Sequence, residues 1–216
     1  KNIAEPMQVY SLQVGPLSNT ARQAQPAMKM PPATAVSDKP SIAVLAFNNM
    51  SGDAEQEYFS DGISEDIITD LSKLSELHVI ARNSSFVYKN VTASVPEMAE
   101  ALGVRYVLEG SVRKAGNRIR VTTQLVKASD GFQVWSGRYD REMTDVFAVQ
   151  DEITSAVVMA IQPVLSNMEL QRILRKSPES LGAWEAYQRG LWHMEKTDPV
   201  ENERAREFFH RGVTLD

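Results

Sequence analysis

Clustered carboxylates are the first feature of this sequence that could do chemistry. Asp61, Glu65 and Asp66 lie close together in a predicted helix. Such groups can bind a metal ion or transfer protons. Acidic side chains near the beginning of a helix also stabilise it through the helix dipole, and this explanation requires no ligand. We therefore expect no metal site at these three residues.

The segment ARNSSFVYK, which begins at Ala81, is the strongest candidate for ligand binding. It forms a predicted loop after a short strand, and α/β sheets often bind ligands beyond the carboxyl ends of their strands. Arg82 and Asn83 offer N–H donors, and Ser84 offers a hydroxyl group. The same residue types also make turns without binding anything, so both interpretations stay open. If a small anion or polar ligand binds this domain, we expect Arg82, Asn83 and Ser84 to contact it.

A basic cluster surrounds the predicted hairpin turn at residues 115–117. It consists of Arg113, Lys114, Arg118 and Arg120. These residues could form an anion-binding patch, or they could keep a strand edge soluble and unpaired. The chain has 28 acidic and 23 basic residues and a net charge of −5, which argues against a dedicated nucleic-acid binder. We expect no nucleic-acid partner.

Several classes of catalytic site are missing from the sequence. The chain has no cysteine, which excludes disulfides, thiolate metal sites and a cysteine nucleophile. His78, His193 and His210 show no metal-ligand spacing. Neither a GxGxxG nor a GxxxxGK phosphate loop occurs. The sequence predicts no catalytic residue, no metal and no cofactor.

Composition places the chain among ordinary globular proteins. It has 216 residues, of which 43% are hydrophobic and 24% charged. The longest apolar runs, IAVLAF and AVVMAI, have six residues each, whereas a membrane span needs roughly 20. We expect no membrane segment, and the absence of cysteine fits a cytoplasmic location. Because the first residue is Lys1, we expect the chain to be a piece of a longer protein.

The beginning of the chain divides into a head and a linker. Residues 1–14 contain a broken alternation of apolar side chains that predicts one strand, which cannot fold alone. Residues 15–40 hold five of the ten prolines and no aromatic residue, which is typical of a linker.

Residues 41–166 form a predicted α/β domain with a mixed sheet. The apolar run at 42–47 indicates a buried strand, and apolar residues from Phe59 to Leu74 recur at helical spacing. Gly62 lies within that helix, which indicates close packing or a broken first turn. A short strand at 77–81 and a helix that begins after Ser94 and ends at Gly103 follow.

The domain ends with three strands and a longer helix. Ala-Gly-Asn and Ser-Asp-Gly turns join the three strand-like segments between residues 104 and 139, which predicts an antiparallel meander. Asp145 is the expected N-cap of the last helix, and Pro163 is expected to kink or end it. The predicted order is strand, helix, strand, helix, three-strand meander, helix.

Residues 167–216 are predicted to be helical. Helix starts are indicated at Ser177-Pro178 and Asp198-Pro199, where a capping side chain precedes a proline. The two helices that follow should form an antiparallel hairpin.

Three stretches resemble known families. The body resembles the TolB amino-terminal-like domain of bacterial multidomain regulators through SIAVLAFNNMSGDAEQEYFSDGISEDIITDLS, LHVIARNSSFVYK, LGVRYVLEGSVRKAGNRIRVTTQLVKASDGFQVWSGRYDR and VFAVQDEI. This resemblance implies a mixed sheet flanked by helices and no catalytic residues.

The tail is similar to the first tetratricopeptide repeat that usually follows this domain. Gly190, Ala205, Phe209 and Gly212 fit its small and aromatic positions. Gly190 and Ala205 are 15 residues apart instead of about 12, which implies an insertion in the turn. The resemblance implies a protein partner at the repeats, and an incomplete repeat implies self-association into a homodimer as an alternative. Six large apolar side chains should supply the contact surface: Trp184, Tyr187, Leu191, Phe208, Phe209 and Val213.

The head resembles the last strand of a class III nucleotidyl cyclase domain through Lys1, Ile3, Pro6, Val9 and Tyr10. The resemblances together imply a non-catalytic regulatory region of a bacterial adenylate cyclase-like signalling protein, whose whole chain would convert ATP to cyclic AMP. The same pair of domains also follows winged-helix DNA-binding domains, so a transcription regulator is the alternative.

Overall fold

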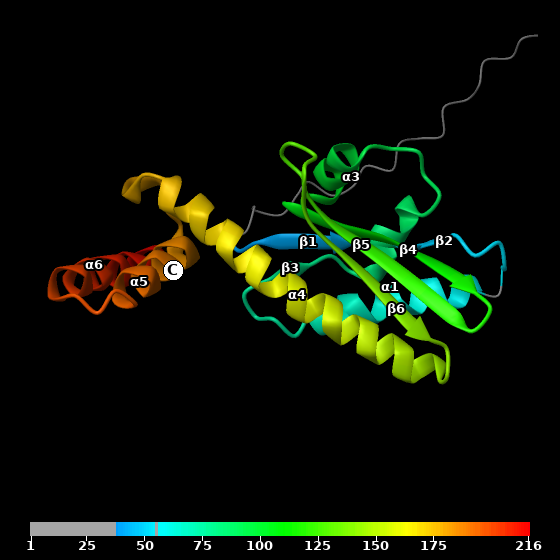
Figure 1. Cartoon of the computed structure of the whole chain (residues 1–216). Coiled ribbons are helices and arrows are strands. Elements are labelled where there is room, and N and C mark those ends of the chain that lie inside the picture. Colours follow the sequence, from blue (N-terminus) through cyan, green and yellow to red (C-terminus); the bar gives the residue numbers. More distant parts are fainter. Residues whose placement is uncertain (1–37, 55) are drawn as a thin grey trace, which may run out of the picture. The chain divides into compact units, whose positions relative to one another are not determined.

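A mixed sheet forms the centre of the fold (Figure 1). The computed structural model describes residues 38–54 and 56–216, so the predicted head strand and residues 15–37 of the linker lie outside it. The strands are β1 (Ser41–Val44), β2 (Asn48–Asn49), β3 (His78–Val79), β4 (Tyr106–Ala115), β5 (Arg118–Lys127) and β6 (Gln133–Glu142). Their order is β3-β1-β4-β5-β6, with β2 paired to β4. β1 is parallel to β3 and β4, whereas β4, β5 and β6 form the predicted antiparallel meander.

Helices cover both faces of the sheet. The helices are α1 (Gln56–Leu71), α2 (Arg82–Ser85), α3 (Val95–Leu102), α4 (Val146–Arg175), α5 (Ala183–Met194) and α6 (Pro199–Leu215), with 3-10 turns η1 (Phe86–Tyr88) and η2 (Pro178–Ser180). α1 and α4 bury the larger core, which includes Phe47, Leu108 and Ile153. α3 and η1 pack on the opposite face around Val107 and Met98. The mixed α/β architecture expected from the sequence is therefore confirmed.

Local capping signals place several helix ends where the sequence predicts them. Ser94 and Glu97 form a reciprocal capping box at the start of α3, and Gly103 ends this helix at φ 66°. The Asp145 side chain accepts a hydrogen bond from the Ala148 amide at the start of α4. Asp198 likewise caps α6 through the amides of residues 200 and 201.

Gly62 allows α1 and α4 to approach each other closely. A side chain at this position would collide with Gln150 of α4. The Gln150 amide lies 3.4 Å from the carbonyl oxygen of Phe59, to which it donates a hydrogen bond. Of the two explanations that the sequence allows for this glycine, close packing is confirmed.

The sequence predicts that Pro163 kinks or ends the last helix of the domain, and the structure excludes the second outcome. α4 continues through Pro163 to Arg175, so the predicted boundary between residues 166 and 167 falls within one helix. A proline removes one backbone hydrogen bond. Ile161 and Leu165 on either side of it are buried in the core, and Ile173 is buried further along, so packing holds the helix together.

Two further segments differ from prediction. ARNSSFVYK forms the helical turn α2 followed by η1, not a loop. Ser177-Pro178 starts only the 3-10 turn η2, and α5 begins later at Ala183. In both cases a short helical segment satisfies its backbone locally, which the turn-forming residue types did not reveal.

The length and composition of α4 would allow it to cross a membrane, and it is the one helix of the described residues that meets this test. Core helices meet the same test. Here the stripe Val149, Ile153, Val157, Ile161 and Leu165 is buried in the domain core.

Candidate functional site at the junction of the sheet and the helical pair

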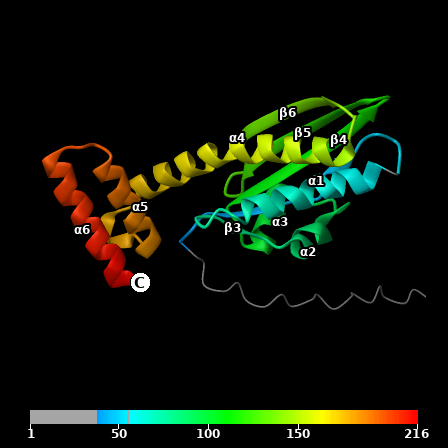
Figure 2. The same cartoon turned by 90° about the horizontal axis from the view of Figure 1, so that it is seen from below.

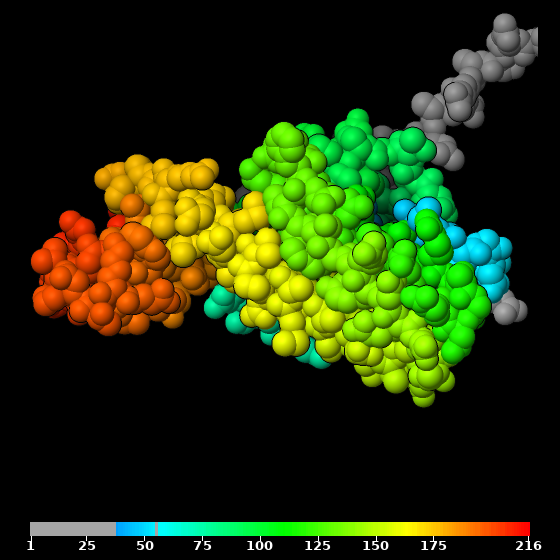
Figure 3. All heavy atoms as spheres, in the orientation of Figure 1, coloured from blue at the N-terminus to red at the C-terminus, as the bar shows by residue number. Residues whose placement is uncertain are grey.

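α4 extends beyond the sheet and contacts α5, which packs on α6 (Figures 1 and 2). All described residues fall within one compact unit. The space-filling view shows the side chains of α4 between the α/β domain and the two last helices (Figure 3). The candidate site lies at this junction.

Glu169 of α4 is the central residue of the junction. Its side chain is 2% exposed although it carries a carboxylate. The Tyr106 hydroxyl donates to one carboxylate oxygen at 2.9 Å. The other oxygen accepts from Arg105 at 3.2 Å and from Arg172 at 2.9 Å. Tyr106 is the first residue of β4, Arg105 directly precedes it, and Arg172 belongs to α4. Their three hydrogen bonds compensate for the burial of the Glu169 charge.

Arg105 connects Glu169 to the segment that leads into β1. Its guanidinium also donates to the backbone carbonyl of Asp38 at 2.8 Å and to that of Lys39. Lys39 in turn donates from its ammonium group to the carbonyl of Ser75 at 3.2 Å. Hydrogen bonds therefore connect the segment before β1 to α4, through Arg105, and to the turn after α1, through Lys39.

Glu185 extends the network to α5. Its side chain is 1% exposed and lies 2.8 Å from Arg172 and 2.7 Å from Lys176. The Gly182 amide donates a further hydrogen bond at 3.1 Å. Because Arg172 contacts both Glu169 and Glu185, it bridges the α/β domain and the helical pair.

The pKa shifts favour the charged forms of Glu185 and Arg172, whereas burial lowers the pKa of the Arg105 guanidinium. Burial alone would raise the pKa of Glu185, but hydrogen bonds from Lys176, Gly182 and Arg172 outweigh it and lower the pKa. Burial opposes the charge of Arg172, but Glu169 and Glu185 raise the pKa of its guanidinium. Burial, followed by the charge of Glu169, raises the pKa of Tyr106, so its hydroxyl keeps the proton that it donates.

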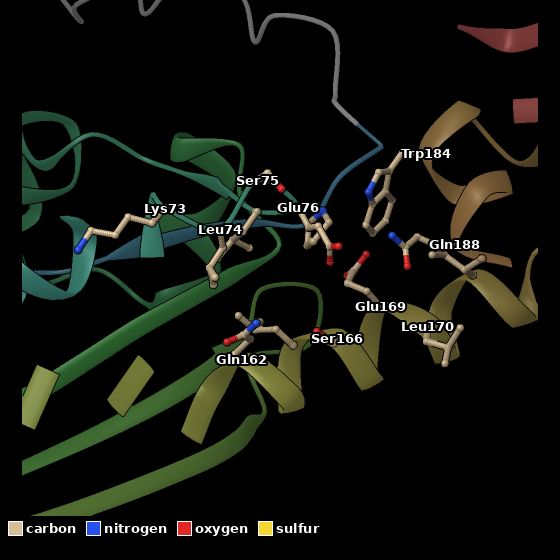
Figure 4. Close-up of a pocket in the computed structure, with 14 residues that line it drawn as sticks. Lys73, Leu74, Ser75, Glu76, Gln162, Ser166, Glu169, Leu170, Trp184 and Gln188 are labelled. Atoms are coloured by element: carbon tan, nitrogen blue, oxygen red, sulfur yellow. The ribbon is translucent and has the colours of Figure 1, made fainter. Parts of the chain in front are cut away.

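Two cavities meet at Glu169. One, of about 270 Å³, lies between the turn at residues 73–77, α4 and α5 (Figure 4). The other, of about 490 Å³, is lined by residues 127–129, Pro96, Arg105 and Arg172. In the described part of the chain, no group of three or more histidine, aspartate or glutamate side chains could hold a metal ion. The groups that line these cavities can bind and position a ligand by hydrogen bonds and charge.

The residues predicted to bind a ligand lie at the opposite end of the parallel strands. Arg82, Asn83 and Ser84 share the single turn of α2 after β3. Asn83 and Ser84 are exposed, whereas Arg82 is half-buried. The Arg82 guanidinium lies 3.1 Å from Glu65 and 4.2 Å from the centre of the Phe86 ring. The three residues are therefore brought together, but Arg82 already has two partners.

The carboxylates of α1 pair with cations of the α2–η1 segment. Lys89 lies 2.6 Å from Asp61 and 2.5 Å from Glu57, and Glu65 pairs with Arg82. Glu57, Asp61 and Glu65 are four residues apart, which places them on one helix face; this spacing could have indicated the pairing. Burial and the nearby Asp151 raise the pKa of Asp66.

Gly190 and Gly212 allow α5 and α6 to pack closely in opposite directions. The Phe209 ring lies against Gly190, and Gly212 lies near the carbonyl of Ala183. At the other end, His193 lies 2.8 Å from Glu201. These contacts show that α5 and α6 are antiparallel, as the sequence predicts.

The six predicted contact residues on α5 and α6 have different environments. Trp184 and Phe208 pack against Ile173, Leu181 and Ala186 in a third core. Leu191 and Phe209 are half-buried. Tyr187 and Val213 are 49% and 80% exposed. Internal packing therefore covers part of the apolar surface that the sequence assigned to a partner, and Tyr187 and Val213 are the most exposed of the six.

The basic hairpin is exposed and partly paired. Arg113 and Arg120 are directly opposite each other on β4 and β5. Arg120 makes two hydrogen bonds to Asp140, at 2.6 and 2.9 Å. Arg118 is also exposed.

Sequence reasoning missed every charged residue of the junction. Glu169 and Arg172 are three residues apart on one helix, a spacing found in many exposed ion pairs. Arg105 and Glu169 are 64 positions apart. Only the Glu185 contact to Gly182, which resembles a capping interaction, had a local signal.

Comparison with known proteins gives two matches in sequence. Residues 37–156 match the model of the second domain of HilA/YgeH-like transcriptional regulators. All 216 residues are 44% identical to putative adenylate cyclase 3 of Rhizobium meliloti (strain 1021), and the chain spans 36% of the length of that relative.

Two solved structures align with part of the chain at low sequence identity. Lipoprotein GNA1162 from Neisseria meningitidis is 20% identical, with a TM-score of 0.43 over 56% of this chain and 95% of that chain. TolB from Acinetobacter baumannii is 18% identical, with a TM-score of 0.41 over 61% of this chain and 30% of that chain. The family model matches more than half of the chain, and we conclude that the protein belongs to the family of the HilA/YgeH-like transcriptional regulator second domain.

Proposed function

We propose that this chain is a regulatory, non-catalytic region of an adenylate cyclase-like signalling protein in the cytoplasm. The observation that carries the proposal is the 44% identity over the whole chain to a part of putative adenylate cyclase 3. The part matched is 36% of that protein, which leaves ample length for a separate catalytic domain. The whole protein would convert ATP to cyclic AMP, and this region would need neither metal nor cofactor.

The junction suggests how such a region would act. Arg172 contacts Glu185 of α5 and Glu169 of α4, and Arg105 connects Glu169 to the backbone of residues 38 and 39. A partner that moves α5 would therefore change contacts where the preceding segment enters β1. Such coupling requires the partner to bind two arrangements of the junction with different affinity.

We further propose that a protein partner, or a second copy of the chain, contacts α5 and α6. The exposed side chains of Tyr187 and Val213 are available for that contact. Trp184 and Phe208 pack against the buried cluster that includes Ile173 of α4. This packing holds α5 and α6 in the position in which their outer side chains could contact a partner.

A replacement experiment in the Rhizobium relative tests this function. The matched segment is exchanged for this chain, deleted, or left intact, and cyclic AMP formation from ATP is measured. We expect the exchange to preserve regulated activity, the deletion to leave basal activity with altered regulation, and the isolated 216-residue chain to form no cyclic AMP. Cyclic AMP formation by the isolated chain, or regulation unaffected by the deletion, would contradict the proposal.

The family match favours a second candidate, a region of a transcription regulator. In this case the DNA-binding domain would be elsewhere in the protein, since this chain has a net charge of −5. Deleting the gene and restoring it would then change transcript levels without changing cyclic AMP. Measuring both quantities in the same cells separates the two candidates.

A further inference from the structure

The cavity between the turn at residues 73–77, α4 and α5 has the size and lining expected of a small-molecule binding site. The cavity has a volume of about 270 Å³, just below the usual range for ligand pockets. A cavity of this size suits a compact compound with one ring. Leu165 and Ile173 in its wall are 4% and 1% exposed, so its apolar part belongs to the packed interior. Elements far apart in the sequence build it, which is typical of binding sites.

Polar groups face the same space as an aromatic ring. Figure 4 shows the indole of Trp184, the amide of Gln188 and the carboxylates of Glu76 and Glu169 directed toward a common region. Gln162 and Ser166 line the cavity along α4. An indole beside hydrogen-bonding groups suits a flat ring that carries one polar substituent.

The charges of the lining select against anions. Lys73 is the one lining residue with a cationic side chain among those described, and its ammonium group lies 2.5 Å from Asp70 and points away from the cavity (Figure 4). Glu169 is already bonded to Tyr106, Arg105 and Arg172. Glu76 is exposed and makes no ion pair with any described residue, so its carboxylate remains available to a ligand.

We propose that this cavity binds a small aromatic amine, with the ring against Trp184 and the amino group toward Glu76. Both the indole and a carboxylate attract an ammonium group, whereas the free carboxylate of Glu76 would repel a carboxylate ligand. Since Trp184 and Gln188 belong to α5 and the rest of the lining to α4 and the α/β domain, a bound ligand would hold α5 in place. The inference goes beyond the proposed function and does not depend on cyclase activity.

Binding can be followed at the indole N–H signal of Trp184 in a nitrogen–proton NMR spectrum, assigned with the Trp184→Phe variant. The probes are 2-phenylethylamine and phenylacetate, which share a ring and differ in charge. We expect the amine to shift the Trp184 signal saturably and phenylacetate to bind at least ten-fold more weakly. An unmoved Trp184 signal, or equal binding of the two probes, would overturn the proposal.

Two variants test the geometry. Glu76→Lys, in an exposed turn, should weaken 2-phenylethylamine at least five-fold and strengthen phenylacetate. Glu207→Lys, at an exposed acid of α6, should change neither. Ser166→Phe should fill part of the cavity and abolish binding of the amine. Unchanged affinities in Glu76→Lys overturn the proposal even if Ser166→Phe fails to fold.

Discussion

Both ends of the parallel strands carry ion pairs, but the two sets differ in burial. At the carboxyl end, Arg82 and Glu65 pair with side chains that are 39% and 56% exposed. At the amino end, Glu169 and Glu185 are 2% and 1% exposed and share Arg172. The interactions have similar lengths, so distance alone does not distinguish them.

This comparison indicates which ion pairs hold the molecule together. Water screens an exposed pair, which contributes about 0–1 kcal/mol to stability. Removing one partner of a buried pair leaves a charge without water or counter-charge, at a cost of about 3–5 kcal/mol. The amino end should therefore control the junction, while the carboxyl end can change its partners at little cost.

The largest expected effect is that of Glu169→Ala. It leaves Arg105, Arg172 and the Tyr106 hydroxyl without their common acceptor. We expect a loss of about 3–5 kcal/mol in the free energy of unfolding, measured by urea titration. The matched change Glu65→Ala at the exposed pair should cost at most about 1 kcal/mol. Equal losses would remove the distinction between the two ends.

A smaller and local effect is expected of Glu185→Gln. The amide keeps an acceptor for the Gly182 amide but removes the charge opposite Arg172 and Lys176. We expect a loss of about 1–3 kcal/mol and faster hydrogen exchange in α5, with β4 and β5 unchanged. Glu207→Gln on exposed α6 is the control. Faster exchange throughout the sheet would show that the junction is not a separate unit.

Acid should weaken the same junction. The pKa of Glu185 is lowered from 4.5, because its hydrogen bonds to Lys176, Gly182 and Arg172 outweigh burial. The unfolded chain therefore binds this proton more readily, and the stabilisation is complete above pH 4.5 and is lost as the pH falls through the folded-state pKa. The difference in unfolding free energy between wild type and Glu185→Gln should shrink over this range. A constant difference would contradict the assignment.

Arg82→Ala should have the smallest effect on stability, about 0–1 kcal/mol. If α2 binds an anion, as the sequence suggests, the variant should weaken phosphate binding at least five-fold in calorimetric titration. Arg206→Ala, at an exposed arginine of α6 outside both candidate anion sites, serves as the control. Unchanged phosphate affinity would remove Arg82, Asn83 and Ser84 as a ligand site.

Features that depend on neighbouring residues could be predicted well from the sequence. The capping box of Ser94 and Glu97, the N-cap at Asp145 and the meander turns each join groups a few residues apart. Pro163 shows the limit of such reasoning. Its local tendency to end a helix is real, but the burial of Ile161 and Leu165 overrides it.

The candidate site at the junction could not be predicted in the same way. Arg82, Asn83 and Ser84 could be placed together because they are consecutive, yet the pairing of Arg82 with Glu65 was not apparent. Arg105 and Glu169 meet only because β4 and α4 are neighbours in the folded chain. Nothing in the residues around Glu169 distinguishes it from an exposed helix acid.

The sequence by itself determined the order of the longer strands and helices, most of their caps and the apolar stripes that form the core. These properties arise from backbone hydrogen bonds and side-chain spacing within a few residues. Only the tertiary structure decided which carboxylates are buried and which cations meet them. The energy of a charge depends on the access of water, and this access is set by segments distant in the sequence that cover it.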